Sequence, residues 1–193
     1  QGETGKNFYK KFKEKNIFIH ANFVSNDYLS KRNKHFIKEK INILLVAGSS
    51  FKRKGFLDSL DSIKLLDEKE GLNFFAVGCN KFAKNEIKKR GLNNRIKFFG
   101  ELNYEHLEKL LKNMDVLLMP SYNEGLPNMM LEAMAKGLIV ISTRVGSIPD
   151  VLQNGTNGYL VNIGDKLDLL EKLRNLNKNK SKLSMMSNEN IIK

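Results

Sequence analysis

The sequence predicts an α/β domain in which helices flank a Rossmann-like parallel sheet. From Ile41 onward, short apolar runs rich in β-formers alternate with amphipathic segments, which is the pattern of successive βα units. Each apolar run is followed by a glycine or a proline, as expected where a strand gives way to a loop. The 193 residues suffice for one well-cored domain and a short appendage, because domains commonly contain about 100–200 residues.

Five strands are expected, because five short apolar runs are each bounded by turn residues. They span residues 42–47, 73–77, 96–99, 116–119 and 139–142. The breakers at their carboxyl ends are Gly48, Gly78, Gly100, Pro120 and, beyond Ser142, Gly146. Ligands of open α/β sheets bind at this edge, so the five ends together outline one site.

Helices are expected between the strands, at residues 56–70, 81–90, 104–114 and 128–136, with a last pair at 166–176 and 182–192. In the first of them, apolar residues recur at three- and four-residue steps. These residues are Phe56, Leu57, Leu60, Ile63 and Leu66. This stripe is expected to pack on the sheet.

The chain divides into three parts by composition. Residues 1–40 form a basic segment and linker, in which 17–24 could be a further strand, while 25–40 is polar and without sustained period. Residues 41–176 form the domain, and 177–193 a helical tail. No internal repeat or low-complexity tract interrupts this order.

The net charge of +12 favours acidic partners such as diphosphates, anionic lipid headgroups or nucleic acid. The alternative is that part of the excess is solvated lysine of compositional origin. Cys79 is the only cysteine, which excludes an intramolecular disulfide and fits a reducing cytoplasm. The sequence contains no signal-peptide pattern and no apolar run of about 18 residues, so we expect a cytoplasmic protein, with peripheral contact to the inner membrane face as an option.

Two glutamates, Glu124 and Glu132, cross a loop-to-helix junction just after the fourth apolar run. Pro127 suits the first position of the helix, which places Glu124 on the loop and Glu132 in a helix of Met, Leu and Ala. Ionised carboxylates accept hydrogen bonds from the paired hydroxyls of sugars, and free amides at a helix start bind phosphate. The alternative is that Glu132 faces solvent or favours the positive end of its helix.

At this point the chain resembles a known family. Residues 124–137 (EGLPNMMLEAMAKG) resemble the signature of the family-4 retaining glycosyltransferases of GT-B fold. The resemblance continues upstream in 43–55 (ILLVAGSSFKRKG), 74–78 and 91–100, and downstream in 145–152 and 154–161, which match the closing loops of that family. The matching segments follow one another in the same order as in the family and together cover about residues 42–176. It implies the C-terminal half of a GT-B fold, the nucleotide-sugar-binding domain.

The resemblance implies a role for each matching residue. Lys54 and Arg53 would bind the diphosphate and stabilise the leaving group, and Glu124 would bind the sugar hydroxyls, which makes these three the catalytic residues. Glu132 would bind the ribose hydroxyls, and Leu102 would lie where the base packs. The remaining expected substrate-binding residues are Gly48, Ser49, Ser121, Gly125, Leu126, Pro127, Asn128 and Met129.

Two of these positions depart from the family's pattern. Many members carry arginine where this chain has Ser49, which leaves Arg53 to supply the second cation. A second glycine is common where Pro127 stands, and proline removes one amide donor. A large subgroup shares this proline, so we interpret it as a variation in sugar fit.

We therefore expect the donor-binding half of a metal-independent, retaining glycosyltransferase of hexosyltransferase type that builds a cell-surface polysaccharide. Its donor would be a UDP- or GDP-sugar, without a cofactor. The N-terminal GT-B domain, with a glycan or lipid-linked acceptor, would be a partner outside this chain, so the chain would be a fragment that is inactive alone. No metal is expected, because the chain has no Asp-x-Asp pair and His20, His35 and His106 lack ligand spacing.

Two other classes of function compete with this one. The first is a non-catalytic module that keeps the nucleotide-sugar site within a larger complex. The second is a basic nucleic-acid binder, which is disfavoured because aromatic residues do not gather on a basic face. The two glutamates together with Lys54 favour the enzyme.

Overall fold

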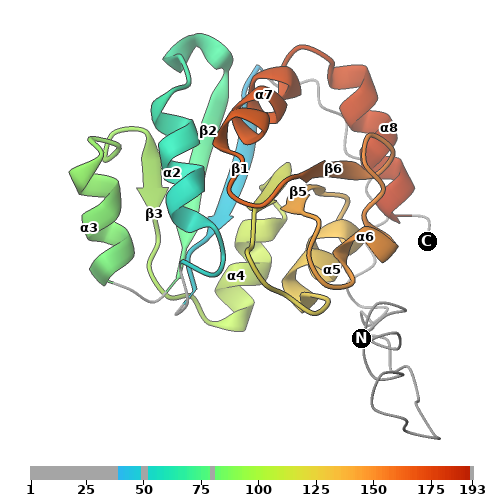
Figure 1. The fold of residues 1–193 in the computed structure, drawn as a ribbon, viewed down its shortest axis with the longest axis horizontal. Coiled ribbons are helices and arrows are strands. Elements are labelled where there is room, and N and C mark those ends of the chain that lie inside the picture. The colour runs from blue at the N-terminus through green and yellow to red at the C-terminus, as the bar shows by residue number, and fades with distance from the viewer. Residues whose placement is uncertain (1–38, 49–51, 79–80, 192–193) are drawn as a thin grey trace, which may run out of the picture.

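The computed structural model describes residues 39–48, 52–78 and 81–191. Ser49, Cys79, His20, His35 and the segment 1–38 lie outside these ranges. Six parallel strands form one sheet in the order β3-β2-β1-β4-β5-β6 (Figure 1). They are β1 Ile41–Val46, β2 Leu72–Val77, β3 Ile96–Phe98, β4 Val116–Met119, β5 Ile139–Thr143 and β6 Gly158–Val161. The predicted α/β class and Rossmann-like sheet are confirmed.

The strand order reverses between β1 and β4, the two central strands of the sheet. β1 pairs with β2 on one side and with β4 on the other. Asn42 and Asp115 fix the register of the second pairing, since the Asn42 amide donates to Asp115 Oδ2 at 2.9 Å and the Asp115 amide to the Asn42 carbonyl at 2.8 Å. Ligands of doubly wound sheets bind at such a reversal, outside the carboxyl ends of the strands.

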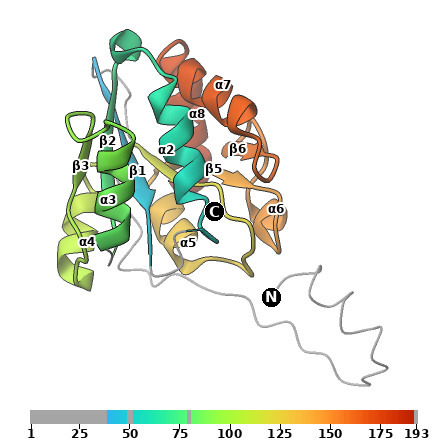
Figure 2. The same ribbon diagram turned by 60° about the vertical axis from the view of Figure 1, so that its left-hand side comes forward.

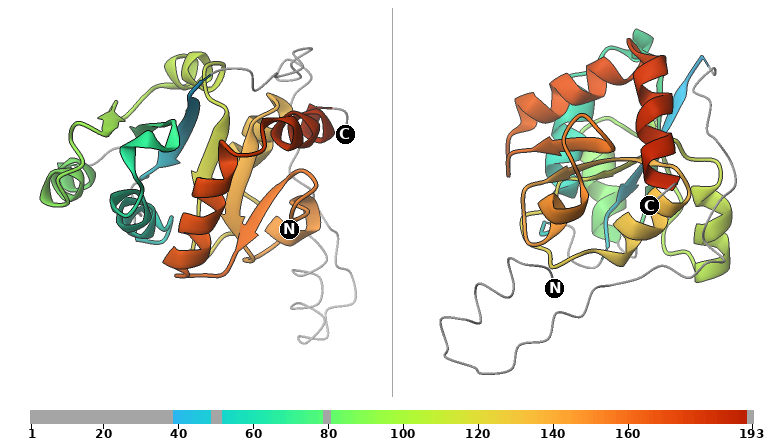
Figure 3. Two further views of the ribbon diagram at one scale, coloured as in Figure 1. Left: turned by 90° about the horizontal axis from the view of Figure 1, so that it is seen from above. Right: turned by 90° about the vertical axis from the view of Figure 1, so that its right-hand side faces the viewer.

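Helices cover both faces of the sheet (Figure 3, left). α2 Phe56–Lys64, α3 Lys81–Lys89 and α7 Lys166–Leu176 pack on one face, and α4 Tyr104–Leu111, α5 Asn128–Ala135 and the short α6 Ile148–Val151 on the other. Side chains of one strand alternate between the two layers: Ile43 and Leu45 join the first apolar cluster and Leu44 the second. Burial on both faces explains why the strands read as continuous apolar runs.

The last helix, α8 Lys180–Ile191, joins the two layers. Its Leu183 and Met186 lie in the first apolar cluster. Its Ser187 hydroxyl donates to the Gly137 carbonyl at 2.6 Å and its Asn190 amide to the Leu138 carbonyl at 2.9 Å, just before β5. None of the helices in the described part of the chain is both long and apolar enough to span a bilayer.

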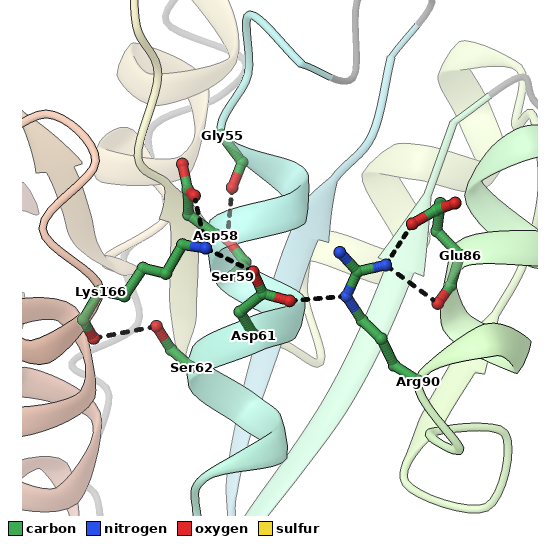
Figure 4. A network of polar contacts seen from close by, with 8 residues as sticks. All are labelled: Gly55, Asp58, Ser59, Asp61, Ser62, Glu86, Arg90 and Lys166. Atoms are coloured by element: carbon green, nitrogen blue, oxygen red, sulfur yellow. Dashed lines mark hydrogen bonds and ion pairs between the residues drawn. The ribbon is translucent and has the colours of Figure 1, made fainter.

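A chain of ion pairs holds the three helices of the first layer together (Figure 4). Asp61 on α2 contacts Lys166 on α7 at 2.5 Å and Arg90, just after α3, at 2.7 Å. Burial raises the pKa of Asp61, but hydrogen bonds from Lys166 and Arg90 outweigh it, so the net pKa lies below the usual 3.8. α2 therefore lies between α3 and α7 (Figure 2).

Three expectations need correction. The predicted helix 56–70 ends at Lys64, because Asp67 is extended and its side chain accepts from the Lys69 amide, which starts a separate turn at Glu68–Glu70. Segments 145–152 and 154–161 were expected as loops, yet they contain α6 and β6. β6 fits beside β5 because Gly158 has no side chain: a Cβ there would lie 2.5 Å from the Val140 carbonyl oxygen.

Gly55 lets the loop after β1 touch the loop after β4. Its φ is +67°, and a Cβ at this position would lie 1.9 Å from the Pro120 carbonyl oxygen. The left-handed conformation disfavours every other residue, and here backbone also fills the space. The closeness of the two loops thus depends on this glycine.

Gly55→Ala is expected to lower the free energy of unfolding by about 2 kcal/mol or more, measured by denaturant titration. Gly91→Ala is the matched control, because Gly91 also has a positive φ of +72° but no atom lies within 4 Å of its Cβ position. The control should lose only the conformational cost of about 1 kcal/mol. Equal losses in the two variants would contradict the role of the loop contact.

Candidate functional site

The candidate site lies at the carboxyl ends of β1 and β4, where the strand order reverses. Arg53 and Lys54 come from the loop after β1, and Glu124 from the loop after β4. A backbone hydrogen bond of 2.7 Å from the Tyr122 amide to the Arg53 carbonyl joins the two loops. The structure therefore brings together the three residues that the sequence singled out as catalytic.

These three residues form a compact charge cluster. Lys54 Nζ lies 2.6 Å from Glu124 Oε1, and Arg53 Nη1 lies 3.3 Å from Glu124 Oε2. The Glu124 side chain is 8% exposed and that of Lys54 17%, whereas Arg53 is 46% exposed. A carboxylate this deeply buried needs a cation beside it, since burying an unpaired charge is costly. The ion pair with Lys54 is therefore expected to stabilise the fold, whatever its part in ligand binding.

Glu124 Oε1 retains unused hydrogen-bonding capacity. The oxygen is buried, and its approach to Lys54 Nζ is close but not aligned as a hydrogen bond, so this atom has no hydrogen-bond partner within the described ranges. Arg53 Nη1 donates a hydrogen bond of 2.9 Å to the Asn123 carbonyl, which fixes the loop just before Glu124. A carboxylate oxygen in this state can still accept a hydrogen bond from a hydroxyl.

Helix α5 begins directly after this loop and offers free amides. Pro127 is the N-cap, with extended φ and ψ of −71° and 125°, and not the first helical residue as predicted. Its carbonyl accepts from the amides of Met130 and Leu131. The amides of Asn128 and Met129 have no acceptor among the described residues, so the positive end of the helix can bind an anion.

Glu132 lies farther along α5, half-buried, in an otherwise apolar helix. Burial raises the pKa of its carboxyl above the usual value, against a weaker lowering by the charge of Lys136. Lys136 itself pairs with Glu108 at 3.2 Å. No hydrogen bond or ion pair in the described part of the chain engages the Glu132 carboxylate, which leaves it available to a ligand.

The other predicted residues border this cluster. The Gly125 carbonyl accepts from the Ser147 amide at 3.0 Å, and the Ser121 hydroxyl is buried without a hydrogen-bond partner in the described part of the chain. Leu126 and Leu102 are partly buried against the second apolar cluster. Gly48 follows β1, next to Gly78, and Ser49 lies outside the described residues. In the described part of the chain, neither Glu132 nor Leu102 forms a hydrogen bond or an ion pair with the charge cluster, so their part in the site stays a prediction.

Sequence reasoning missed two residues that support the loop after β4. The Tyr122 hydroxyl hydrogen-bonds to Asp58 on α2, and this contact, with some burial, raises the pKa of Tyr122. Gly146 allows close packing on the same loop, because a Cβ there would lie 2.0 Å from the Glu124 carbonyl oxygen. Gly146 was recognised only as a breaker. Nothing in the sequence pairs Tyr122 with Asp58.

Comparison with known proteins gives one family. Glycosyl transferases group 1 matches residues 27–193. The lipopolysaccharide glucosyltransferase WaaG of Escherichia coli K12 is 34% identical over 134 residues, which cover 67% of this chain and 35% of WaaG. The chain spans about a third or less of the length of the curated relatives that it matches first.

Solved structures share the fold. The C-terminal domain of the group 1 glycosyl transferase LpcC from Francisella tularensis has a TM-score of 0.72 at 20% identity, over 88% of this chain and 95% of that domain. HepE of Anabaena, solved in complex with UDP and glucose, has a TM-score of 0.70 at 20% identity, over 87% of this chain and 47% of HepE. The described sheet and helices are thus those of a C-terminal GT-B domain.

Lys54→Met is expected to lower the free energy of unfolding by about 2 kcal/mol, because it keeps the side-chain length but leaves Glu124 with Arg53 alone. Adding Glu124→Gln should restore part of the loss, since the buried charge is then gone as well. Denaturant titration of the wild type, both single variants and the double variant measures this coupling. Strictly additive losses would show that the pair contributes nothing to stability.

Proposed function

We propose that this chain, which belongs to the family of glycosyl transferases group 1, carries the donor site of a metal-independent, retaining sugar transfer from a nucleoside diphosphate sugar. The observation that carries the proposal is the cluster of Arg53, Lys54 and Glu124 at the strand-order reversal, next to the free amides of α5. A diphosphate needs cations and amide donors, and a sugar needs a buried acceptor. The cluster offers both within one pair of loops.

Each group has a defined task in this proposal. Arg53 and Lys54 bind the diphosphate and stabilise the charge that develops on the β-phosphate as the sugar leaves. The amides of Gly125 and Leu126 on the loop before α5, and those of Asn128 and Met129 in its first turn, receive phosphate or sugar oxygens. Glu124 accepts from the sugar hydroxyls and Glu132 from the ribose hydroxyls. The base lies near Leu102.

Sugar transfer exchanges one bond at the anomeric carbon of the donor for another. The bond between the anomeric carbon and the β-phosphate oxygen breaks, and its electron pair goes to the phosphate. An acceptor hydroxyl attacks the same face of the sugar, which retains the configuration, and its proton passes to the departing phosphate. Charge stabilisation by two fixed cations is what lets this step proceed without a metal ion.

The acceptor and the setting of the reaction belong to the proposal too. We assign the acceptor, a glycan or a lipid-linked glycan of the cell surface, to an N-terminal GT-B domain, and we expect this chain alone to transfer no sugar. The similarity to WaaG, a lipopolysaccharide glucosyltransferase, supports this acceptor class. The net charge of +12 supports work in the cytoplasm at the inner, anionic face of a membrane.

The second candidate function is a non-catalytic module that binds a nucleotide sugar within a larger complex. It would use the same cluster, so binding alone does not separate the two. Sugar transfer by the full-length protein, with a UDP- or GDP-sugar and a lipid-linked acceptor, separates them. Transfer that disappears in Lys54→Met supports the enzyme, and binding without transfer supports the module.

Lys54→Met is expected to weaken binding of the preferred nucleoside diphosphate by about 1.5–3 kcal/mol, the scale of a hydrogen bond to a charged group. Calorimetry with UDP, GDP and ADP in the presence of EDTA measures this loss and names the nucleotide. Lys88→Ala is the control, because it removes one charge from an exposed position on α3. Equal affinities of wild type and Lys54→Met would move the diphosphate elsewhere, and loss of wild-type binding in EDTA would reject metal independence.

Glu132→Gln is expected to weaken binding of the bare nucleotide by about 1 kcal/mol, because the ribose hydroxyls lose an ionised acceptor. A 2′-deoxynucleotide should show less of this difference. Since burial raises the pKa of Glu132, wild-type affinity should begin to fall on acidification at a higher pH than for an ordinary glutamate. Titration of the phosphates affects both proteins equally, so a pH profile identical in both would contradict the assignment.

A further inference from the structure

We infer that Glu124 makes the site prefer the sugar-loaded donor over the bare nucleoside diphosphate, because the cations that a diphosphate needs are those that neutralise Glu124. The inference rests on the proposed function and deepens it. In addition to accepting hydrogen bonds from the sugar, Glu124 lowers the affinity of the site for the nucleoside diphosphate product.

Each oxygen of the Glu124 carboxylate faces one of the two cations. Oε1 lies 2.6 Å from Lys54 Nζ and Oε2 lies 3.3 Å from Arg53 Nη1. The Glu124 side chain is 8% exposed, so water compensates its charge poorly when a cation turns to another anion. Any ligand that draws Arg53 and Lys54 toward itself therefore leaves Glu124 poorly compensated.

A bare diphosphate adds negative charge beside the buried carboxylate and offers it nothing in return. Arg53 and Lys54 must then compensate both the diphosphate and Glu124. These two anions repel each other strongly at short range, because solvent screening is weak there. The site therefore binds a bare diphosphate less tightly than the same two cations would bind it if Glu124 were absent.

A sugar on the diphosphate changes this balance. Its hydroxyls donate hydrogen bonds, and they bring no further charge. Glu124 Oε1 is buried and has no hydrogen-bond partner among the described residues, so a hydroxyl meets an acceptor with capacity to spare. Hydrogen bonds from the sugar hydroxyls thus compensate Glu124 when Arg53 and Lys54 turn toward the diphosphate. Once the sugar has been transferred, the hydroxyls leave with it, and Glu124 again competes with the diphosphate for Arg53 and Lys54.

The experiment compares the affinities of UDP and UDP-glucose, or of GDP and GDP-mannose if the guanine nucleotide binds, for wild type and Glu124→Gln. Calorimetry should show that the bare diphosphate binds Glu124→Gln about fivefold more tightly, the scale of one ion pair of about 1 kcal/mol. The donor should gain less or lose affinity. The preference for donor over product should therefore shrink.

Glu132→Gln is the matched control, because it makes the same change of charge on a glutamate that contacts neither cation. It should not strengthen binding of the bare diphosphate. In the Lys54→Met background, the gain from Glu124→Gln should diminish, since the 2.6 Å partner is gone. If thermal unfolding shows that Glu124→Gln does not fold, Glu124→Asp takes its place. Its side chain is one methylene shorter, which moves the carboxylate away from the cations, so it should increase the affinity for the bare diphosphate by less than Glu124→Gln would.

The outcomes separate the inference from the proposed function. If Glu124→Gln binds the bare diphosphate no more tightly than wild type while Lys54→Met loses binding, the inference is overturned and the donor site stands. If wild type binds none of the nucleotides, the proposed function fails, and the inference fails with it. If Glu124→Gln increases the affinity for the bare diphosphate more than the affinity for the sugar-loaded donor, the result supports both the inference and the proposed function.

Discussion

The structure depends on one constraint, which is that a buried carboxylate at the centre of the sheet edge must keep a cation beside it. Glu124 meets this requirement only if the loop after β1 and the loop after β4 touch. Gly55 permits that approach from one side, and Gly146 permits the packing of the Glu124 loop from the other. The Tyr122 amide then ties the loops together through the Arg53 carbonyl. Charge compensation and close backbone packing thus support each other.

The scaffold serves this arrangement from both layers. On one face, Asp61 links α2 to α7 and to the end of α3, so the helix that follows the Arg53-Lys54 loop is held by both of its neighbouring helices. On the other face, the apolar residues of α5 bury its inner side against β4 and β5, while its first amides stay without acceptors in the described part of the chain. A rigid helix start beside a fixed pair of cations suits the recognition of an anion better than a flexible loop would.

Much of this could be predicted from the sequence, and the rest could not for physical reasons. The apolar runs of β4 and β5 predicted their strands directly, because every residue of these two strands is buried and no polar alternation interrupts them. β6 was missed because Gly158 looks like a turn residue, although here it allows close approach to Val140. The extended Asp67 ended α2 through its own side-chain bond, a local competition that periodicity does not report. Glu124 and Lys54 were each predicted as site residues, but an ion pair between residues 70 apart has no signature in sequence.

The pairing of β1 with β4 has a consequence for how the molecule assembles. Asn42 bonds to Asp115 across 73 residues, and the α2, β2, α3, β3 and α4 segments lie between them in the chain. Parallel pairing over such a span forms late, because the loop entropy is lost before the contacts repay it. During synthesis, the halves of the anion site would leave the ribosome far apart in time. The proposed nucleotide would therefore bind only after these strands have paired, and it would protect the central strands from exchange with solvent as one cooperative unit.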